Sequence, residues 1–244
     1  MRNPEPLPAE EAPELLIFPF NGNGLEALDC LGSAFRLIGF VDDTPEKQGI
    51  DHHGHAVYSR EAFDRWPHAM VLAVPGSPKS YPFRQRIIDG LGIDASRWAR
   101  VVHPKASVSP LATVGHNVLI MAGVVITSNA VIGDHVCILP NTVVHHDAHI
   151  GDWSLLGATV IAAGHSVIGE NCYIGSGSHL MNGVTIGAAA LVGLGSNVVR
   201  DVGAAQRVAG NPARTVGRII ESQRLDGCND PACPRQGVNT TSTQ

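Results

Sequence analysis

The most constraining feature of the sequence is a six-residue period that runs from Val102 to Gly203. The segment divides into seventeen consecutive hexads without an insertion, and sixteen of them begin with Val, Ile or Leu, with Ala162 as the departure. An amphipathic helix repeats every ~3.6 residues and a half-buried strand every ~2, so neither explains this period. Three short faces of six residues close into a triangular coil of about 18 residues, with the aliphatic first positions inside. The pattern therefore predicts a left-handed parallel β-helix of nearly six coils.

The second and fifth positions of the hexads are restricted as well. The fifth position always holds Ala, Val, Thr, Ser or Cys, which are small or β-branched side chains. The second position is Gly in eight hexads. Because Gly tolerates backbone angles that other residues avoid, we expect a tight turn at the second position.

The segment before the hexads has a different pattern, in which apolar strands alternate with helix-like stretches. LLIFPF (15–20), RLIGFVDD (36–43) and AMVLAVP (69–75) are predicted strands, and FRQRIIDGLG (83–92) is a predicted helix that stops at Gly. This alternation predicts a small parallel sheet of Rossmann-like type, with ligands favoured at the carboxyl ends of the strands. The loop NGNG after the first strand is a candidate phosphate site or an ordinary turn between strand and helix; its residues are Gly22, Asn23 and Gly24.

Four regions follow from these patterns. Residues 1–13, which are rich in Pro and Glu and have no apolar signal-peptide segment, are predicted to be a flexible arm. Residues 14–100 form the predicted Rossmann-like domain and residues 101–218 the predicted β-helix. Residues 219–244 are predicted to be a flexible tail, in which CNDPAC (228–233) offers only two possible metal ligands.

The composition and net charge indicate which kinds of binding partner and which cellular compartment to expect for this protein. Apolar residues make up 44% of the chain and charged residues 16%, as in globular proteins. The net charge of −5 gives no electrostatic reason to expect nucleic acid or an anionic membrane as a partner. The stretch 153–169 has no formal charge but contains Gly, Ser, Thr and His and no continuous apolar run, so no membrane helix is expected. Five scattered cysteines favour a reduced, cytoplasmic protein over a disulfide framework.

Residues 144–151, VHHDAHIG, are the strongest candidate for chemistry. With about 18 residues per coil, His146 shares a column with Ser128 and Gly164. Since Gly164 has no side chain, we expect open space beside His146 and a backbone N–H that can stabilise an oxyanion. Imidazole, with an ordinary pKa of about 6.5, suits a general base. His145 is expected to point to the other face and to be structural. The alternative is a surface histidine hydrogen-bonded at a coil corner.

A zinc site is a rival interpretation, because histidines of neighbouring coils ligate zinc in β-helical carbonic anhydrases. Zinc needs three or four convergent ligands at about 2 Å. No two histidines of the hexads are eighteen residues apart, and His146 and His165, nineteen apart, are expected to be only diagonal neighbours. The sequence therefore predicts no metal.

Four motifs follow one another along the chain: FVDDTPEKQG after the second strand, HPKASV at the entry to the hexads, HHDAHIGDWS within them and VAGNPAR at their exit. With these motifs, the two regions together resemble the sugar acyltransferases of NeuD/PglD type over roughly residues 14–218. The resemblance implies a homotrimer with active sites between neighbouring coils. It also implies transfer of an acetyl group from acetyl-CoA to a sugar, commonly to the amine of a nucleotide-linked amino sugar.

The resemblance also implies roles for individual residues. It makes His146 the general base and Asp147 the group that orients it. The acceptor nucleotide is expected near Asp42 and Asp43. The pantetheine arm and the phosphates of CoA are expected near the following residues: Gly164, Ser176, Gly195, Arg207 and Arg214.

Two departures from the family accompany the match. PFNGNG (19–24) stands where the family has a loop like GxGGHG, so that Asn23 replaces a histidine. Leu155 stands nine residues after His146, where family members often have a second histidine.

Amine and hydroxyl acceptors need the same base, so an O-acetyltransferase is the closest alternative to an N-acetyltransferase. A trimeric, non-catalytic sugar-binding scaffold is the alternative from another class.

Overall fold

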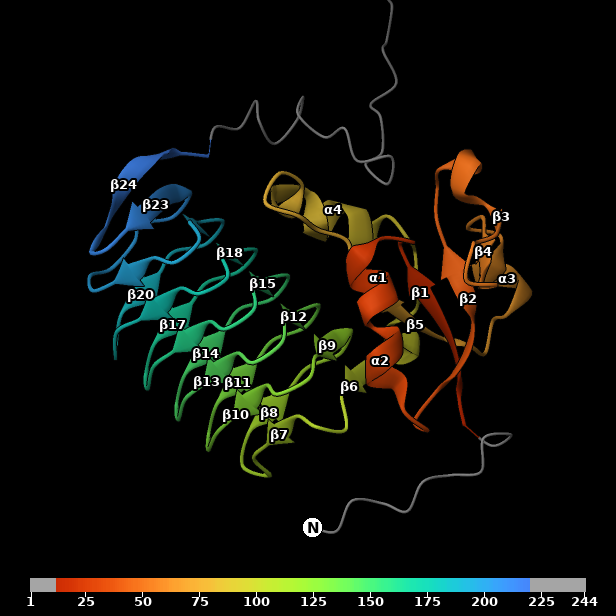
Figure 1. The fold of residues 1–244 in the computed structure, drawn as a ribbon, viewed down its shortest axis with the longest axis horizontal. Coiled ribbons are helices and arrows are strands. Elements are labelled where there is room, and N and C mark those ends of the chain that lie inside the picture. The colour runs from red at the N-terminus through yellow and green to blue at the C-terminus, as the bar shows by residue number, and fades with distance from the viewer. Residues whose placement is uncertain (1–11, 220–244) are drawn as a thin grey trace, which may run out of the picture.

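The computed structural model describes residues 12–219, and it places a small α/β unit beside a β-helix (Figure 1). The α/β unit has a five-stranded sheet of order β3-β4-β2-β1-β5, in which only β3 runs antiparallel to its neighbour. Its strands are β1 (Glu14–Phe18), β2 (Arg36–Val41), β3 (Gly49–Ile50), β4 (Ala56–Tyr58) and β5 (Met70–Ala73). Its helices are α1 (Gly22–Glu26), α2 (Leu28–Leu31), α3 (Ala62–Arg65) and α4 (Arg84–Asp89), with short 3₁₀ turns at Pro45–Lys47, Tyr81–Phe83 and Ala95–Arg97.

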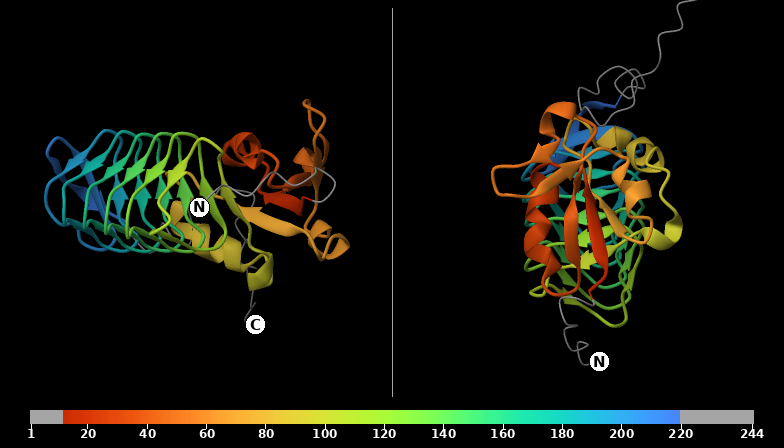
Figure 2. Two further views of the ribbon diagram at one scale, coloured as in Figure 1. Left: turned by 90° about the horizontal axis from the view of Figure 1, so that it is seen from below. Right: turned by 90° about the vertical axis from the view of Figure 1, so that its right-hand side faces the viewer.

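The hexads form the triangular coil that their period predicts, and Figure 2 shows the stacked turns from two further sides. Face 1 holds β7 (Ser107–Val108), β10 (Val125–Ile126), β13 (Val143–Val144), β16 (Ile161–Ala162), β19 (His179–Leu180) and β22 (Asn197–Val198). Face 2 holds β8 (Thr113–Val114), β11 (Val131–Ile132), β14 (His149–Ile150), β17 (Val167–Ile168) and β20 (Thr185–Ile186). Face 3 holds β6 (Arg100–Val102), β9 (Val118–Ile120), β12 (Cys137–Ile138), β15 (Leu155–Leu156), β18 (Tyr173–Ile174), β21 (Leu191–Val192), β23 (Gln206–Gly210) and β24 (Ala213–Arg218).

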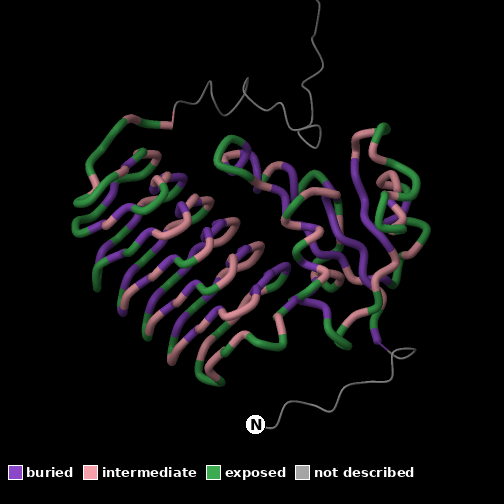
Figure 3. Tube along the Cα trace, in the orientation of Figure 1, coloured by how far each residue is buried: buried purple, intermediate pink, exposed green. Residues whose placement is uncertain are grey.

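Strand pairing confirms the predicted coil length and fold class. Val125 pairs with Val143, and Val143 with Ile161, which are steps of eighteen residues. First and fifth hexad positions line the interior from Val118 onward, as at Val144, Ala148 and Ile150, and Figure 3 shows this alternation of buried and exposed chain. The aliphatic first positions therefore stack into one continuous apolar core, which stabilises strands too short to be stable alone.

The glycines at the second position have a different reason from the predicted one. The unusual backbone angles occur at the fourth position, for example φ 58° at Asp147 and φ 59° at His165. At the second position a side chain would collide with the next coil: a Cβ on Gly157 would lie 2.5 Å from Ser176 N, and one on Gly151 2.6 Å from Gly169 C. Glycine is therefore selected there by the close approach of stacked coils, and the prediction of a strained second position was wrong.

The α/β unit packs on the outer side of face 3. Leu15, Ile17 and Leu72 of its sheet share an apolar cluster with Leu119 and Cys137 of the β-helix. Face 3 therefore presents apolar side chains on both sides, inward to the helix core and outward to the α/β unit. Because this interface is a packed core, the two units are held at a fixed orientation.

His135 sits at this interface and must be neutral there. Asn117 accepts from Ala73 N at 2.7 Å through Oδ1, which fixes its amide so that Nδ2 donates to His135 Nδ1 at 2.9 Å. The ring stacks on Trp153, with centroids 5.7 Å apart. Burial lowers the pKa of His135 below its usual value of 6.5. A proton on Nδ1 would face the Asn117 N–H, so the hydrogen bonds and the burial favour the same neutral form.

A pH dependence of stability follows from His135. Since the folded-state pKa is lowered, its contribution is complete above the unfolded pKa of about 6.5 and is lost as pH falls from there toward the folded pKa. We expect the melting temperature to fall between pH 7.5 and 5.5 by more in the native protein than in His135→Asn. The control is His179→Gln on the exposed outer side of face 1, which should behave as the native protein. Equal losses in all three proteins would contradict the assignment.

Candidate active site

The segment VHHDAHIG forms the corner between faces 1 and 2. β13 ends at Val144 and β14 begins at His149, so residues 145–148 make the turn. Val144 and Ala148 point into the core and hold the turn, while His146 and Asp147 are exposed. The left-handed angle of Asp147 is one that Asp and Asn adopt more readily than most residues. The hexad pattern thus presents both side chains to solvent from a rigid corner.

His146 and Asp147 form a hydrogen-bonded pair. His146 Nδ1 lies 2.7 Å from Asp147 Oδ2, and Asn129 Nδ2 donates to Asp147 Oδ1 at 3.1 Å. The hydrogen bond from His146, and then that from Asn129, lower the pKa of Asp147 below its usual range, so this carboxylate is ionised at neutral pH. Because a carboxylate can only accept, a neutral His146 carries its proton on Nδ1 and keeps a lone pair on Nε2. The pair therefore has the form of a general base with an orienting acid.

Gly164 lies directly against the imidazole of His146. A Cβ at Gly164 would be 2.7 Å from both Cε1 and Nε2 of His146, so the absence of a side chain makes room for the ring itself. The expected open space is thus occupied by the imidazole, which leans one coil further along the column. The backbone N–H groups of Ala163 and His165, on either side of Gly164, donate to the backbone carbonyls of Leu180 and His146, respectively. The backbone N–H of Gly164 donates to no backbone carbonyl of residues 12–219.

His165 also approaches this pair, contrary to the expectation of a merely diagonal neighbour. Its ring meets that of His146 edge to face with centroids 5.1 Å apart, and its Nε2 lies 3.9 Å from Asp147 Oδ2. The reason is the coil length, because Asn129, Asp147 and His165 are spaced by eighteen residues and form one column. The spacing of eighteen residues between Asp147 and His165 is visible in the sequence. It relates an aspartate to a histidine, however, and spacings between histidines alone do not reveal it.

Apart from Gly164, the residues expected to contact CoA lie away from His146 in the chain. Ser176 and Gly195 are on the corner between faces 3 and 1, whereas His146 is on the corner between faces 1 and 2. Ser176 Oγ accepts from Ala158 N at 3.1 Å, and Gly195 is exposed with φ 62°. Arg207 and Arg214 are exposed on β23 and β24. One chain therefore does not bring these residues to His146.

The loop of the α/β unit is fixed by its own hydrogen bonds. Asn21 caps α1 by accepting from Gly24 N at 2.8 Å, and Gly22 has free space where a Cβ would stand. The Asn23 side chain faces the carbonyls of Val74 and Gly76 at 3.5 and 3.4 Å. Gly24 is needed for packing, since a Cβ there would lie 2.6 Å from Pro19 O.

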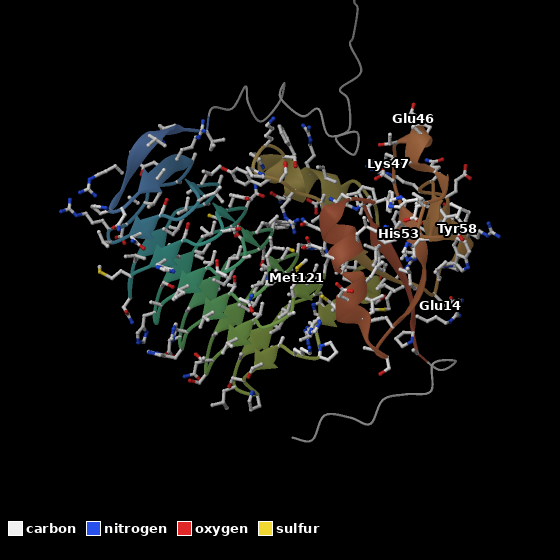
Figure 4. The ribbon with its side chains drawn as sticks, in the orientation of Figure 1. Glu14, Glu46, Lys47, His53, Tyr58 and Met121 are labelled. Carbon is white, nitrogen blue, oxygen red and sulfur yellow. The ribbon has the colours of Figure 1, made fainter. Side chains whose placement is uncertain are left out.

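The acidic pair after β2 is largely occupied. The buried Asp42 carboxylate accepts from Phe20 N, Thr44 N and the ammonium of Lys47, a residue labelled in Figure 4. Asp43 is paired with Arg60 at 2.6 and 2.7 Å. Both aspartates therefore shape the strand end, and their part in binding a nucleotide stays a prediction.

Two further features complete the description of the site. Leu155 is buried on face 3 among the interface side chains and does not face His146 in the same chain. A cavity of about 410 Å³ lies between α1, α2 and the β-helix, and no sequence pattern predicts it. Its lining includes Glu26, Asp29 and His103, with Met121 (labelled in Figure 4) at its inner wall.

Comparison with known proteins agrees with this geometry. Residues 111–145, 129–163 and 165–199 match the family model described as bacterial transferase hexapeptide (six repeats). These residues carry the repeats of that family, and the fold in which they lie is a left-handed parallel β-helix. Comparison of this hexapeptide-repeat protein with curated proteins gave no match.

Several solved structures share the whole arrangement. PerB from Caulobacter crescentus, in complex with CoA and GDP-perosamine, is 26% identical with a TM-score of 0.74, covering 85% of this chain and 98% of that chain. The acetyltransferase domain of PglB from Neisseria gonorrhoeae, in complex with acetyl coenzyme A, is 23% identical with a TM-score of 0.74, covering 84% and 100%. WeeI from Acinetobacter baumannii is 24% identical with a TM-score of 0.73, also covering 84% and 100%. The similarity to the PglB domain and to WeeI shows a shared fold and nothing further.

Across residues 12–219, no helix is both long and apolar enough to cross a membrane.

Proposed function

We propose that this protein is an acyltransferase that moves the acetyl group of acetyl-CoA to the amine of a nucleotide-linked amino sugar. The observation that carries the proposal is the exposed His146–Asp147 pair, with a 2.7 Å hydrogen bond that leaves Nε2 free to accept a proton. The likeness to PerB, whose structure holds CoA and GDP-perosamine, supports the choice of donor and acceptor.

The chemistry proceeds by direct attack on the thioester. As the acceptor amine bonds to the acetyl carbonyl carbon, His146 Nε2 takes the proton that the nitrogen loses, and Asp147 stabilises the resulting imidazolium. The carbonyl oxygen becomes an oxyanion, for which the Gly164 N–H is a suitably placed donor. Collapse of the intermediate breaks the carbon–sulfur bond, and the CoA thiolate leaves with the proton held by His146. No residue of the protein is acylated in this scheme.

The separation of the two corners supports a homotrimer. Ser176 and Gly195 lie on a different corner from His146, so one chain offers the base and the groove for pantetheine on different edges of the β-helix. A threefold arrangement in which one copy's corner between faces 1 and 2 meets the next copy's corner between faces 3 and 1 brings them together. Arg207 and Arg214 are proposed to meet the CoA phosphates in that cleft. We propose the α/β unit, with Gly22, Asn23, Gly24, Asp42 and Asp43, as the holder of the nucleotide.

The free thiols of the cysteines within residues 12–219 support the cytoplasm as the compartment of this reaction. Cys30, Cys137 and Cys172 are free and buried. Burial raises the pKa of Cys137 to about 11, so this thiol stays protonated and unreactive. Unpaired thiols are the usual state in a reducing compartment.

The proposed function is tested by the release of free CoA. The full-length protein is mixed with acetyl-CoA and one of a panel of GDP- and UDP-linked amino sugars, GDP-perosamine among them, and thiol release is followed continuously. We expect release that depends on the amino sugar and that is absent with the matching nucleotide-linked neutral hexoses. Equal release with both kinds of sugar would favour an O-acetyltransferase. Release with neither kind, under conditions where acetyl-CoA binds, would favour a sugar-binding scaffold.

Gly164→Ala is expected to impair catalysis without weakening the fold. The new methyl group would lie 2.7 Å from His146 Nε2, so the imidazole must turn away from its position. A displacement of about 1 Å at a catalytic group lowers rates by up to ~10²-fold, and we expect a fall in kcat of about 10- to 10²-fold. The control is Gly217→Ala on β24, where a Cβ meets nothing within 4 Å. Native kcat in Gly164→Ala would show that the ring position is not critical.

A further inference from the structure

The corner that carries the base also gathers a set of metal-ligating side chains. His146, Asp147 and His165 each offer one ligand atom, and these atoms all lie within 4.8 Å of one another. The group is unique in this respect among residues 12–219. Two imidazoles and one carboxylate, with open positions left for water, form the ligand set of many zinc sites.

We propose that a divalent transition-metal ion of the Zn²⁺ class binds to His146, Asp147 and His165, and that the bound ion prevents His146 from acting as a base. The site is regulatory in effect and is not required for the reaction. The binding itself does not depend on the proposed function, whereas the inhibition rests on it.

The distances suit an ion after small side-chain adjustments. Asp147 Oδ2 is 2.7 Å from His146 Nδ1 and 3.9 Å from His165 Nε2. A zinc ion at about 2 Å from each of three ligands separates them by about 3.3 Å, which lies between these two distances. The His146, Asp147 and His165 side chains are 49%, 36% and 67% exposed, so each is free to turn slightly.

The surroundings hold the ligands in place for an ion. Asn129 donates to Asp147 Oδ1, which leaves Oδ2 to face the two imidazoles. The turns themselves are fixed, because Asp147 N donates to Ser128 O and His165 N donates to His146 O, both at 3.1 Å. Partners that orient ligating side chains in this way strengthen metal binding.

The protonation of His146 explains why the ion would inhibit. In the metal-free pair the neutral ring carries its proton on Nδ1 and its lone pair on Nε2. An ion bound at Nδ1 takes the lone pair of that atom, so the proton of the neutral ring moves to Nε2. Nε2 then cannot accept the proton of the amine. Inhibition thus follows from the change of tautomer, even when the substrates still bind.

Binding is tested by titrating the full-length protein with Zn²⁺ in a calorimeter. We expect His165→Gln to weaken the site by at least about 10-fold, since one of three ligands is lost. The matched control is His179→Gln, an exposed histidine on face 1 that is paired with no carboxylate of residues 12–219. All variants carry Cys228→Ser and Cys233→Ser, so that these two thiols contribute no heat. Equal affinity in His165→Gln and His179→Gln would overturn the site.

Two further readouts make the test specific. Co²⁺ in place of Zn²⁺ should give the visible absorption of a nitrogen- and oxygen-ligated ion, reduced in His165→Gln; an unchanged spectrum in that variant would overturn the site. In the acetyl-transfer assay, Zn²⁺ should inhibit the His179→Gln protein at concentrations that leave His165→Gln active. Zinc that binds as proposed but does not inhibit would support the site and contradict the role of Nε2 as the base.

Discussion

His146→Ala is expected to lower kcat by about 10²- to 10⁴-fold, the usual effect of removing a general base. The imidazole is exposed and its neighbours Val144 and Ala148 hold the corner from inside, so the variant should fold and bind acetyl-CoA normally. Because the base acts in the transition state, the loss should appear in kcat more than in KM. The measurement is steady-state thiol release, with acetyl-CoA affinity determined separately by calorimetry.

The neighbouring histidine provides the matched control for this variant. His145 is half-buried and its backbone N–H donates to Ala162 O, while its side chain is outside the hydrogen bonds of the pair. His145→Ala should therefore keep kcat within a few-fold of the native value. Native turnover in His146→Ala, or equal losses in both variants, would remove His146 from the mechanism.

Arg84→Ala is expected to lower the free energy of unfolding by about 3–5 kcal/mol, through lost hydrogen bonds and a new cavity. Arg84 is 0% exposed, and its guanidinium donates to the carbonyls of Pro75, Trp153 and His135. Pro75 follows β5, whereas His135 and Trp153 belong to consecutive coils, so this side chain joins the α/β unit to the β-helix. Burial lowers the pKa of Arg84 to about 10, which still leaves the group charged at neutral pH.

Denaturant unfolding at one fixed protein concentration measures this effect. The control is Arg36→Ala, an arginine that is 53% exposed and paired with Glu14 at the surface. An exposed pair contributes only about 0–1 kcal/mol, so this control should change little. A loss in Arg84→Ala no larger than that of the control would show that the guanidinium is not a connection between the units.

The fold could be predicted because its cause is repeated in the sequence. Each coil needs an aliphatic residue at the same positions, so a period of six is visible without any structure. The reason for the second-position glycines could not be predicted, because it depends on how closely coils stack, as at Gly157 and Ser176. The hydrogen bonds of Arg84 could not be predicted either. Their acceptors are the carbonyls of Pro75, His135 and Trp153, which belong to three separate turns of the chain.

The candidate site was predictable in part for the same reason. The pairing of His146 with Asp147 involves adjacent residues, and Gly164 lies one coil away, so both relations follow from the repeat. His165 was missed because its partner is Asp147, not another histidine. The relation of Ser176 and Gly195 to the base depends on a second copy of the chain, which no pattern within one sequence specifies.

The covalent structure of the product distinguishes acetyl transfer to a sugar amine from its alternatives. The protein is incubated with acetyl-CoA carrying a ¹³C-labelled acetyl carbonyl and with the amino sugar that gave the fastest thiol release, and the product is examined by NMR. We expect a labelled carbonyl that correlates with an amide N–H on the sugar and that survives mild alkali. A labelled carbonyl on a sugar oxygen, released by mild alkali, would contradict transfer to the amine, and a sugar without label would contradict acetyl transfer altogether.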